Sequence, residues 1–201
     1  MKILALSDVR AKKLYDYYRP GCLREYDLII ACGDLPKYYL EFFVTMARCP
    51  VFYVHGNHDD SFADNPPEGC ECIDGDLVVY QGIRILGLGG SYRYKDGRNM
   101  YTERQMKRRI WKLMPKIWQH KGFDILVAHA PARNHNDFDY LSHRGFECFC
   151  TLLKKYQPKY FLHGHIHRNY GIRIPQKSKF EDTVVINAYE YCEIEYEKKD
   201  R

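Results

Sequence analysis

The 201-residue sequence lacks several features that would define its class at once. No apolar run approaches the roughly 20 residues of a membrane-spanning helix, so no span is predicted. Repeats, linkers and low-complexity segments are missing, which excludes repeat arrays and tethered domains. Neither charge dominates, since 31 Lys and Arg face 26 Asp and Glu. We therefore expect a single globular domain over residues 1–201.

The C-x-x-C spacing of redox and zinc sites is also missing, although the chain has eight cysteines. Cys70 and Cys72 are two residues apart, as are Cys148 and Cys150. We interpret the cysteines as reduced structural residues. Residues 1–8 are too short for a signal peptide and are expected to form the first strand. A cytoplasmic location is the resulting expectation.

Five short apolar runs each end in polar residues of the same few types. The runs cover residues 3–6, 28–32, 51–54, 125–128 and 160–162. If these strands lie parallel, their carboxyl ends converge at one edge of a sheet. Carboxylates, amide oxygens and imidazoles are ligand types of Mn, Fe and Zn. The side chains expected to meet there are Asp8, Asp34, Asn57, His58, His129, His165 and His167.

Taken singly, these residues have ordinary explanations. Asp8, Asp34 and Asn57 also fit caps of the helices or turns that follow their strands. His129 and His165 also fit satisfied core histidines. The remaining histidines, His55, His120 and His163, are expected to be structural or exposed.

In their order, these blocks resemble those of the calcineurin-like metallophosphoesterases of small prokaryotic type. That family has D-x-H, G-D, G-N-H-D/E, a lone His and G-H-x-H. The corresponding blocks here are Asp8-Val9-Arg10, Gly33-Asp34, Gly56-Asn57-His58-Asp59, His129 and Gly164-His165-Ile166-His167. One position departs from the pattern, because Arg10 stands where the family has a metal-binding histidine.

The resemblance implies an α/β fold, a four-layer αββα sandwich of two mixed β-sheets flanked by helices. It implies divalent metal ions as cofactors, with Mn first and Fe or Zn as alternatives. Asp34 would bridge two metals. The second metal would also be held by Asn57, His129 and His165, and the first by Asp8 and His167. His58, steered by Asp59, would assist the leaving group.

Arg10 leaves the number of metals per chain at one or two. A guanidinium has no lone pair to donate, so Arg10 cannot be a ligand. It is expected either to hold a phosphoryl oxygen as a catalytic residue or to reach a surface carboxylate.

Two functions follow from the resemblance. The first is metal-dependent hydrolysis of a small phosphoester, by a phosphatase or a phosphodiesterase that uses a metal-activated water. The second is a catalytically weak binding or scaffold protein of the same fold. His58 and Asp59 favour the enzyme, while Arg10 favours impairment. Neither nucleic acid nor a membrane is expected as a partner, and the substrate, native metal and oligomeric state are left open.

Helices are expected over residues 11–18, from Pro36 to about residue 48, and after Thr102. Gln105 would complete a capping box with Thr102, and Pro115 would kink or split that helix. The basic segment 95–121 is interpreted as a solvated helix face, with attraction of phosphate as the alternative. The loop 132–144 is long enough to suggest a function. His143 and Arg144 of this loop are candidate substrate contacts. Arg93, in the segment 89–103, is a candidate phosphate contact.

Overall fold

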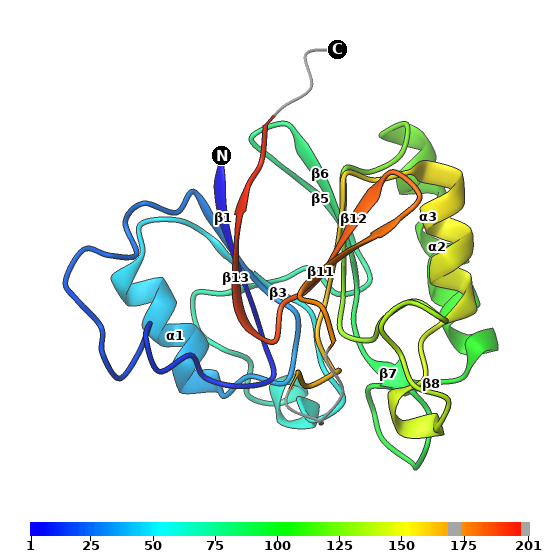
Figure 1. The fold of residues 1–201 in the computed structure, drawn as a ribbon, viewed down its shortest axis with the longest axis horizontal. Coiled ribbons are helices and arrows are strands. Elements are labelled where there is room, and N and C mark those ends of the chain that lie inside the picture. Colours follow the sequence, from blue (N-terminus) through cyan, green and yellow to red (C-terminus); the bar gives the residue numbers. More distant parts are fainter. Residues whose placement is uncertain (169–173, 198–201) are drawn as a thin grey trace.

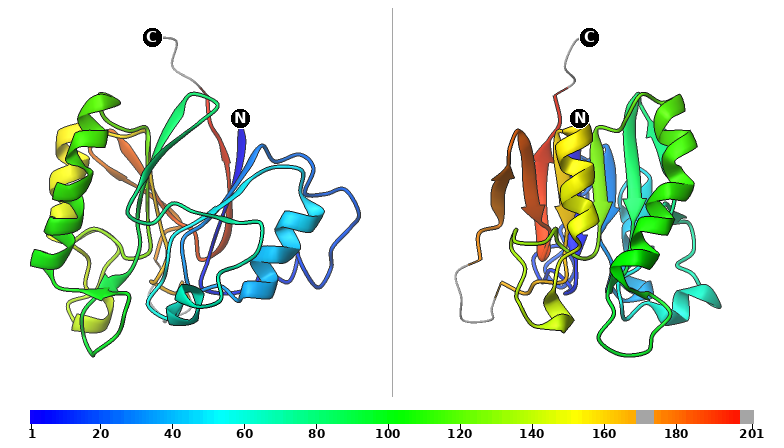
Figure 2. Two further views of the ribbon diagram at one scale, coloured as in Figure 1. Left: turned by 180° about the vertical axis from the view of Figure 1, so that it is seen from behind. Right: turned by 90° about the vertical axis from the view of Figure 1, so that its right-hand side faces the viewer.

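Two β-sheets lie face to face in the computed structural model, and helices cover the outer face of each sheet (Figure 1). The structure describes residues 1–168 and 174–197. Figure 2 shows the same layers from behind and from one side. The predicted class, a four-layer αββα sandwich of two mixed sheets, is therefore confirmed.

The first sheet, which we call sheet A, has the strand order β13-β1-β2-β3-β4. Only β13 runs antiparallel to its neighbour, β1. Ile3 of β1 faces the other sheet and Leu4 faces the outer helix, and both are fully buried. Burial on both faces explains why these strands are continuous apolar runs. The bounds are β1 Lys2–Ser7, β2 Leu28–Ala31, β3 Val51–Tyr53, β4 Glu71–Cys72 and β13 Glu190–Glu195.

The second sheet, sheet B, has the order β11-β12-β10-β9-β6-β5, with a parallel centre and one antiparallel strand at each edge. A separate two-stranded ribbon, β7 and β8, lies outside it. The bounds are β5 Leu77–Tyr80, β6 Ile83–Leu88, β7 Ser91–Tyr92, β8 Met100–Tyr101, β9 Ile125–Ala128, β10 Tyr160–His163, β11 Lys177–Phe180 and β12 Thr183–Asn187.

Three apolar layers hold the sandwich together. One lies between the sheets and includes Ile30 and Val127. A second joins sheet A to α1, through Phe43. A third joins sheet B to α2 and α3, through Ile110 and Phe149. The helices are α1 Lys37–Met46, α2 Glu103–Gln119 and α3 Glu147–Tyr156, with 3-10 turns η1 Asp60–Ala63 and η2 Leu141–His143.

The prediction of a helix over residues 11–18 was wrong, because that segment consists mainly of turns. The backbone N–H of Leu14 donates to Ala11 O at 3.1 Å, and that of Tyr17 donates to Lys12 O at 3.0 Å. A helix of only two turns is marginal without tertiary support. Here the Tyr15 ring packs edge-on against Phe42 of α1, so packing on α1 fixes the segment.

The predicted capping box of α2 is confirmed. Gln105 N donates to Thr102 Oγ1 at 3.2 Å, and Thr102 N donates to Gln105 Oε1 at 2.8 Å. Pro115, however, does not split the helix, which runs unbroken to Gln119. The buried stripe on its inner face continues past Pro115 from Leu113 to Ile117, and packing on sheet B outweighs the lost backbone hydrogen bond.

Three strands, β7, β8 and β11, have no apolar run or alternation that could predict them. The β11 segment has two lysines and a serine before Phe180, so it lacks an apolar run. Lysines are common on edge strands, where they discourage pairing with other chains. The strands β7 and β8 are two residues each, too short to show a period.

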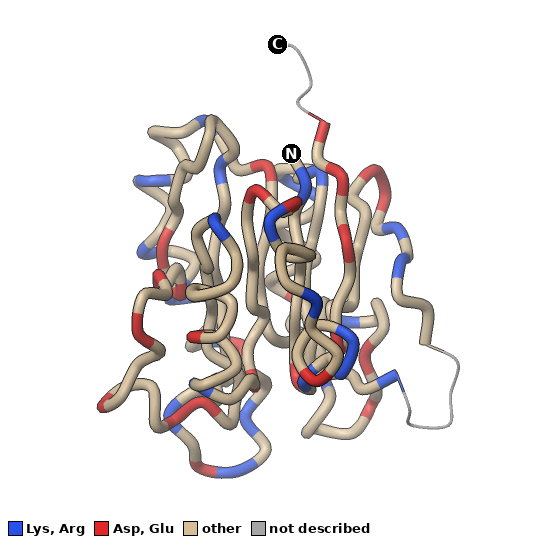
Figure 3. The backbone as a smooth tube through the Cα atoms, turned by 90° about the vertical axis from the view of Figure 1, so that its left-hand side faces the viewer, with Lys and Arg blue, Asp and Glu red and all other residues tan. Residues whose placement is uncertain are grey.

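Charged residues of both signs lie mainly on the helices and loops, and the central strands carry few (Figure 3). Over the part of the chain that the structure describes, no helix has both the length and the apolar character to cross a membrane. The strands β1, β2, β3, β9 and β10 all end on the same side of the molecule, at the lower edge in Figure 1. The predicted site residues follow at that edge.

Candidate metal centre

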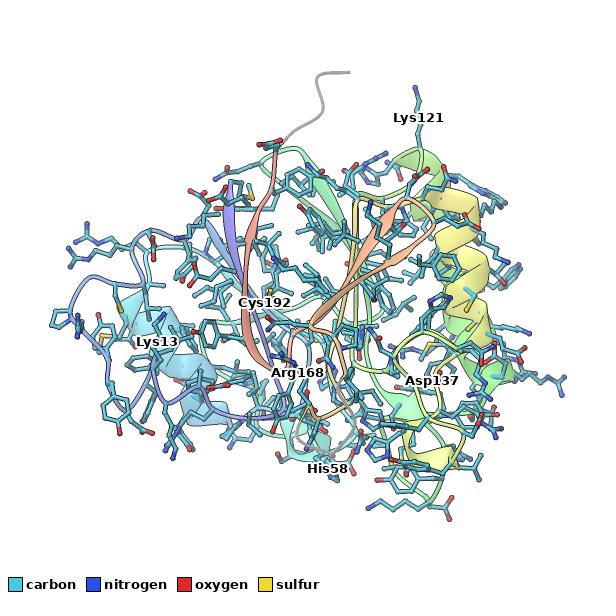
Figure 4. The ribbon with its side chains drawn as sticks, in the orientation of Figure 1. Lys13, His58, Lys121, Asp137, Arg168 and Cys192 are labelled. Atoms are coloured by element: carbon cyan, nitrogen blue, oxygen red, sulfur yellow. The ribbon has the colours of Figure 1, made fainter. Side chains whose placement is uncertain are left out.

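Both sheets contribute to the site, three ligand candidates from each. Asp8, Asp34 and Asn57 follow strands of sheet A, and His129, His165 and His167 follow strands of sheet B. Figure 4 labels His58 at this lower edge, beneath the ends of the strands. The structure thus brings the predicted strand ends together.

Left-handed backbone marks three of these positions. The φ angles are 66° at Asp8, 57° at Asp34 and 66° at His165. Such angles are uncommon outside glycine and gather at functional sites, where surrounding contacts hold them. Here Asp34 N donates to Asp59 Oδ2 at 2.8 Å, and His165 N donates to Asp8 Oδ2 at 3.0 Å. These hydrogen bonds aim the side chains at one another.

Two glycines of the motifs make room for the carboxylates. A Cβ at Gly56 would lie 2.0 Å from Asp34 Oδ1. A Cβ at Gly164 would lie 1.8 Å from Ser7 Oγ and 2.6 Å from Asp8 Oδ2. Any side chain at either position would displace an acid, which explains glycine there.

A cluster of donor atoms lies at the centre of the site. One ligand atom each from Asp34, His129 and His165 fall within 4.8 Å of one another. His129 Nε2 is 3.2 Å from Asp34 Oδ2 and 3.0 Å from Asn57 Oδ1. Buried positions exclude water from much of this cluster, since His129 is fully buried and Asn57 and His165 nearly so.

The contacts of His129 fix which of its ring nitrogens faces the cluster. Its Nδ1 lies 2.8 Å from Cys32 O, so Nδ1–H donates to that carbonyl. In the neutral ring the Nε2 lone pair then faces the oxygens of Asp34 and Asn57, so three acceptors converge with no donor between them. A proton or a metal ion relieves this, and a divalent cation suits the donor set.

The pKa values follow the same electrostatics. Burial raises the pKa of Asp34, but the adjacent His129 and the His58 backbone N–H outweigh it and bring the pKa to about 2. Burial lowers the pKa of His129, but Asp34 outweighs it and brings the pKa to about 9. Asp34 is thus a carboxylate, and His129 attracts a positive charge to its Nε2.

The pKa of His165 is shifted in the opposite direction to that of His129. Burial and the neighbouring His129 lower the pKa of His165 to about 3, so its ring is neutral. Its Nε2 lies 2.6 Å from Ser142 O and donates to that carbonyl. The lone pair is therefore on Nδ1. The loop before α3 thereby orients a candidate ligand, as outer-shell partners of metal-binding histidines do.

A second, less complete position lies beside this cluster. His167 Nε2 is 3.5 Å from Asp8 Oδ1. Burial raises the pKa of Asp8, but the hydrogen bond with His167, the charge of His129 and the hydrogen bond with Ser7 together outweigh it, and the net pKa is lowered. The Tyr189 ring packs against His167, with centroids 4.9 Å apart. These contacts hold a carboxylate and an imidazole side by side, and both are ligand types for a divalent cation.

Arg10 points away from both positions. Its Nη2 is 3.1 Å from Asp16 Oδ1, its Nη1 donates to Tyr38 Oη at 3.3 Å, and its guanidinium lies over the Tyr15 ring. This is the surface-carboxylate alternative of the two considered. The catalytic role expected for Arg10 has no support in this geometry, because Asp16, the Tyr38 hydroxyl and the Tyr15 ring already engage the guanidinium.

His58 and Asp59 occupy different environments. His58 is exposed and lines the pocket, while its backbone N donates to Asp34 Oδ1 at 2.7 Å. Asp59 Oδ2 accepts hydrogen bonds from the backbone of Gly56 at 2.7 Å and of Asp34 at 2.8 Å. Asp59 therefore holds the backbone that presents Asp34, and steering of the His58 ring stays a prediction.

A pocket of about 270 Å³ opens over the cluster. Its size is at the low end for ligand sites, which fits a small substrate. Tyr94, Ser142 and His143 form the wall opposite the strand ends. Of these, only His143 was expected. The other two basic candidates do not line the pocket, since Arg93 is exposed beside Tyr94 in the chain and Arg144 lies over the Tyr92 ring. The Ser142 contact had no sequence signal because it is made by a backbone carbonyl.

Comparison with known proteins assigns the chain to a protein family. A model of the family described as "Calcineurin-like phosphoesterase" matches residues 1–169, which include every candidate ligand. The chain belongs to the calcineurin-like phosphoesterase family. The predicted resemblance is confirmed, and a metal-dependent phosphoesterase centre is what the family implies for the cluster.

Relatives of this chain include an uncharacterized protein of Haemophilus influenzae, 26% identical over 79% of this chain and 81% of that protein. UPF0046 protein T07D4.2 of Caenorhabditis elegans is 32% identical over 57% of this chain and 28% of its own length. The chain covers 61% of a second worm relative, UPF0046 protein C25E10.12, at 22% identity.

Two solved structures share the fold. One has a TM-score of 0.66 at 13% identity and covers 96% of this chain and 94% of its own. The other, TT1561 of Thermus thermophilus, has a TM-score of 0.60 at 16% identity, covering 94% and 89%. At such identities the likeness concerns the fold alone.

Proposed function

We propose that the protein hydrolyses a small phosphoester with the help of a bound divalent metal ion. The observation that carries this proposal is the convergence of Asp34, His129 and His165 beneath a small pocket. Two of these residues have their remaining ring nitrogens fixed by backbone carbonyls, so their lone pairs are aimed inward. Membership of the phosphoesterase family gives the arrangement its chemistry.

A divalent ion in such a centre lowers the pKa of water and neutralises charge on phosphoryl oxygens. The residues of the chain would hold and orient the ion. Asp34, Asn57, His129 and His165 would hold the tighter position, and Asp8 and His167 the weaker one. Backbone N–H groups that donate to Asp8 and Asp34, together with the buried positions of the histidines, keep these ligands in place before metal binds.

His58 is proposed to assist departure of the leaving group. Its ring lines the pocket from the side of sheet A, while its backbone is tied to Asp34 Oδ1. That tie places an exposed imidazole next to a candidate bridging carboxylate without making it a ligand. A histidine so placed can protonate or stabilise a departing alkoxide or phenoxide. Ser142 and His143 would bound the substrate on the opposite side.

The test measures turnover of aryl phosphate monoesters and diesters by the purified protein with added Mn²⁺, Fe²⁺ or Zn²⁺. We expect activity with at least one metal, loss on chelation with EDTA and recovery on adding metal back. Asp34→Asn should lose metal and at least about 100-fold of the activity, as expected when a ligand rather than an outer partner is removed. Asp139→Asn, at a carboxylate 96% exposed, is the matched control and should keep both.

Two results would contradict the proposal. Undiminished turnover after complete chelation would remove the metal from the mechanism. Tight metal binding with no turnover of any ester would instead favour the scaffold function.

A further inference from the structure

The outward face of α2 carries both tryptophans of the chain, Trp111 and Trp118, with exposed fractions of 76% and 65%. They are seven residues apart, so they lie on the same side of the helix about 10.5 Å apart along its axis. Pro115 lies between them and is also exposed. Single exposed apolar residues are ordinary, but these three form one apolar strip.

Basic residues flank the strip. Arg104 and Arg108 continue it toward the start of the helix, and Lys112 lies beside Trp111. All three are exposed, and none has an ion pair among the described residues. We call the set the tryptophan face: Arg104, Arg108, Trp111, Lys112, Pro115 and Trp118.

Core packing does not explain the tryptophan face. The helix is held to sheet B by its opposite side, where Met106, Ile110 and Ile117 are buried. Figure 2 shows α2 and α3 side by side on the outside of sheet B, with the outer side of α2 at the edge of the molecule. The two indole side chains are thus exposed to water, and they take no part in the packing of α2 on sheet B.

We propose that the tryptophan face docks the protein on an anionic lipid bilayer. Indole rings favour the membrane interface, where the apolar body is buried and the N–H is hydrated. Lysine and arginine beside them are attracted to anionic headgroups. This peripheral contact replaces the sequence-based expectation of no membrane partner. It involves no membrane-spanning segment.

Charge and shape favour a bilayer over other partners. A second copy of the chain docked through this face would gather the basic residues of both copies, Arg104, Arg108 and Lys112, in one contact whose defined residues include no acid, and like charges repel. Single-stranded nucleic acid is bound in basic grooves where neighbouring bases stack. The tryptophan face is instead convex, and its two indoles are separated by two helical turns. A flat anionic surface matches both its shape and its charge.

Docking through α2 leaves the pocket open. None of the residues lining the pocket over the metal centre lies on α2. Figure 4 shows Lys121, just after α2, pointing outward at the end of the molecule opposite His58. The helix therefore lies along the side of the molecule, and variants of its outer face should keep their turnover of soluble esters.

The intrinsic fluorescence of the full chain tests the proposal, because its only two tryptophans lie on this face. The protein is mixed with phosphatidylcholine vesicles, with or without phosphatidylglycerol, and then sedimented. We expect a blue-shifted emission and co-sedimentation with the anionic vesicles only. Both should weaken at about 0.5 M salt, where screening shortens electrostatic attraction.

Variants separate the apolar and the charged contributions. Trp111→Ala combined with Trp118→Ala should weaken sedimentation with anionic vesicles at least about tenfold. Arg108→Gln and Lys112→Gln should each weaken it about fivefold, the effect of one basic group near an anionic leaflet. Tyr17→Ala is the matched control, since Tyr17 is 73% exposed in the segment that packs on α1. All variants should keep the wild-type melting temperature and ester turnover.

Four outcomes would overturn the proposal. They are the absence of any blue shift with anionic vesicles, full vesicle binding by the double tryptophan variant, a blue shift with a single-stranded oligonucleotide but none with vesicles, and a dimer in light scattering that the tryptophan variant abolishes.

Discussion

Arg10 is the residue at which this chain departs from its family, and the structure gives the departure a physical meaning. The guanidinium pairs with Asp16 and lies over Tyr15, so it neither ligates a metal nor faces the pocket. The ligand candidates that remain at the weaker position are Asp8, His167 and Asp34, and Asp34 would be shared with the tighter position. We infer that the tighter position, with Asn57 and two histidines, fills first.

Arg10→His should therefore raise the metal content from about one toward two per chain, together with the activity. The new imidazole supplies the missing ligand and removes a positive charge. Elemental analysis and turnover measure the two effects. Arg10→Ala removes the charge without adding a ligand, so it should leave the metal content near one. Two tightly held metals in the wild type, unchanged in Arg10→His, would show that this inference is wrong.

His58→Ala should lower kcat by roughly 10²–10⁴, the usual contribution of a general acid. Metal content should stay the same, because His58 is tied to Asp34 only through its backbone N–H. The loss should be larger for an alkyl ester than for a nitrophenyl ester, whose leaving group needs no proton. His120→Ala, at the end of α2, serves as the histidine control. Loss of bound metal in His58→Ala would place this side chain among the ligands instead.

At the scale of the elements, one buried carboxylate ties three segments together. Asp74, between β4 and β5, accepts from Gly89 N at 2.6 Å, contacts His55 Nδ1 at 2.9 Å and pairs with Arg109 of α2. Burial raises the pKa of Asp74, but the hydrogen bond with His55 and the charge of Arg109 outweigh it and lower the net pKa. The carboxylate thus stabilises the contact between α2 and both sheets.

Asp74→Asn should lower the free energy of unfolding at pH 7 by roughly 3–5 kcal/mol, since one partner of a buried ion pair is removed. Because the folded pKa lies below the ordinary 3.8, this contribution is present above about pH 4 and is lost as the pH falls through the folded pKa. Urea unfolding at several pH values should show wild type and variant converging in acid. Asp76→Asn, at a half-exposed carboxylate nearby, should have a small effect. An equal difference at pH 7 and pH 3 would count against this pairing.

The elements that the sequence predicted well are the strands that are buried on both faces of their sheet. Strands buried on both faces, such as β2 and β9, are plain apolar runs, and the ligand types at their ends identify the site edge. The segment 11–18 misled because its aromatic residues pack on α1 rather than along a helix. Asp59 and Ser142 could not be assigned their contacts from sequence, since each acts on or through backbone atoms.

At the scale of the whole molecule, the metal is expected to add to stability. Its ligands come from both sheets, so a bound ion belongs to the folded state alone. At a free metal concentration 100 times the Kd, binding adds about 2.7 kcal/mol. For a chain of this length that corresponds to a rise in Tm of roughly 5–10 °C. Differential scanning fluorimetry with Mn²⁺ and with EDTA measures the shift. Asp34→Asn should lose most of it, and Asp139→Asn should retain it.

The order of the strands also bears on how the protein is made. In sheet A, β1 lies between β2 and β13, so the first strand is paired with the last. Asp8 is hydrogen-bonded to His165, 157 residues later in the chain. A nascent chain that has not reached β9 therefore holds Asp8, Asp34 and Asn57 without their histidine counterparts, and β1 keeps an open edge until β13 is made. We expect metal to be captured, and any hydrolysis to begin, only after the residues up to His167 and β13 have been synthesised.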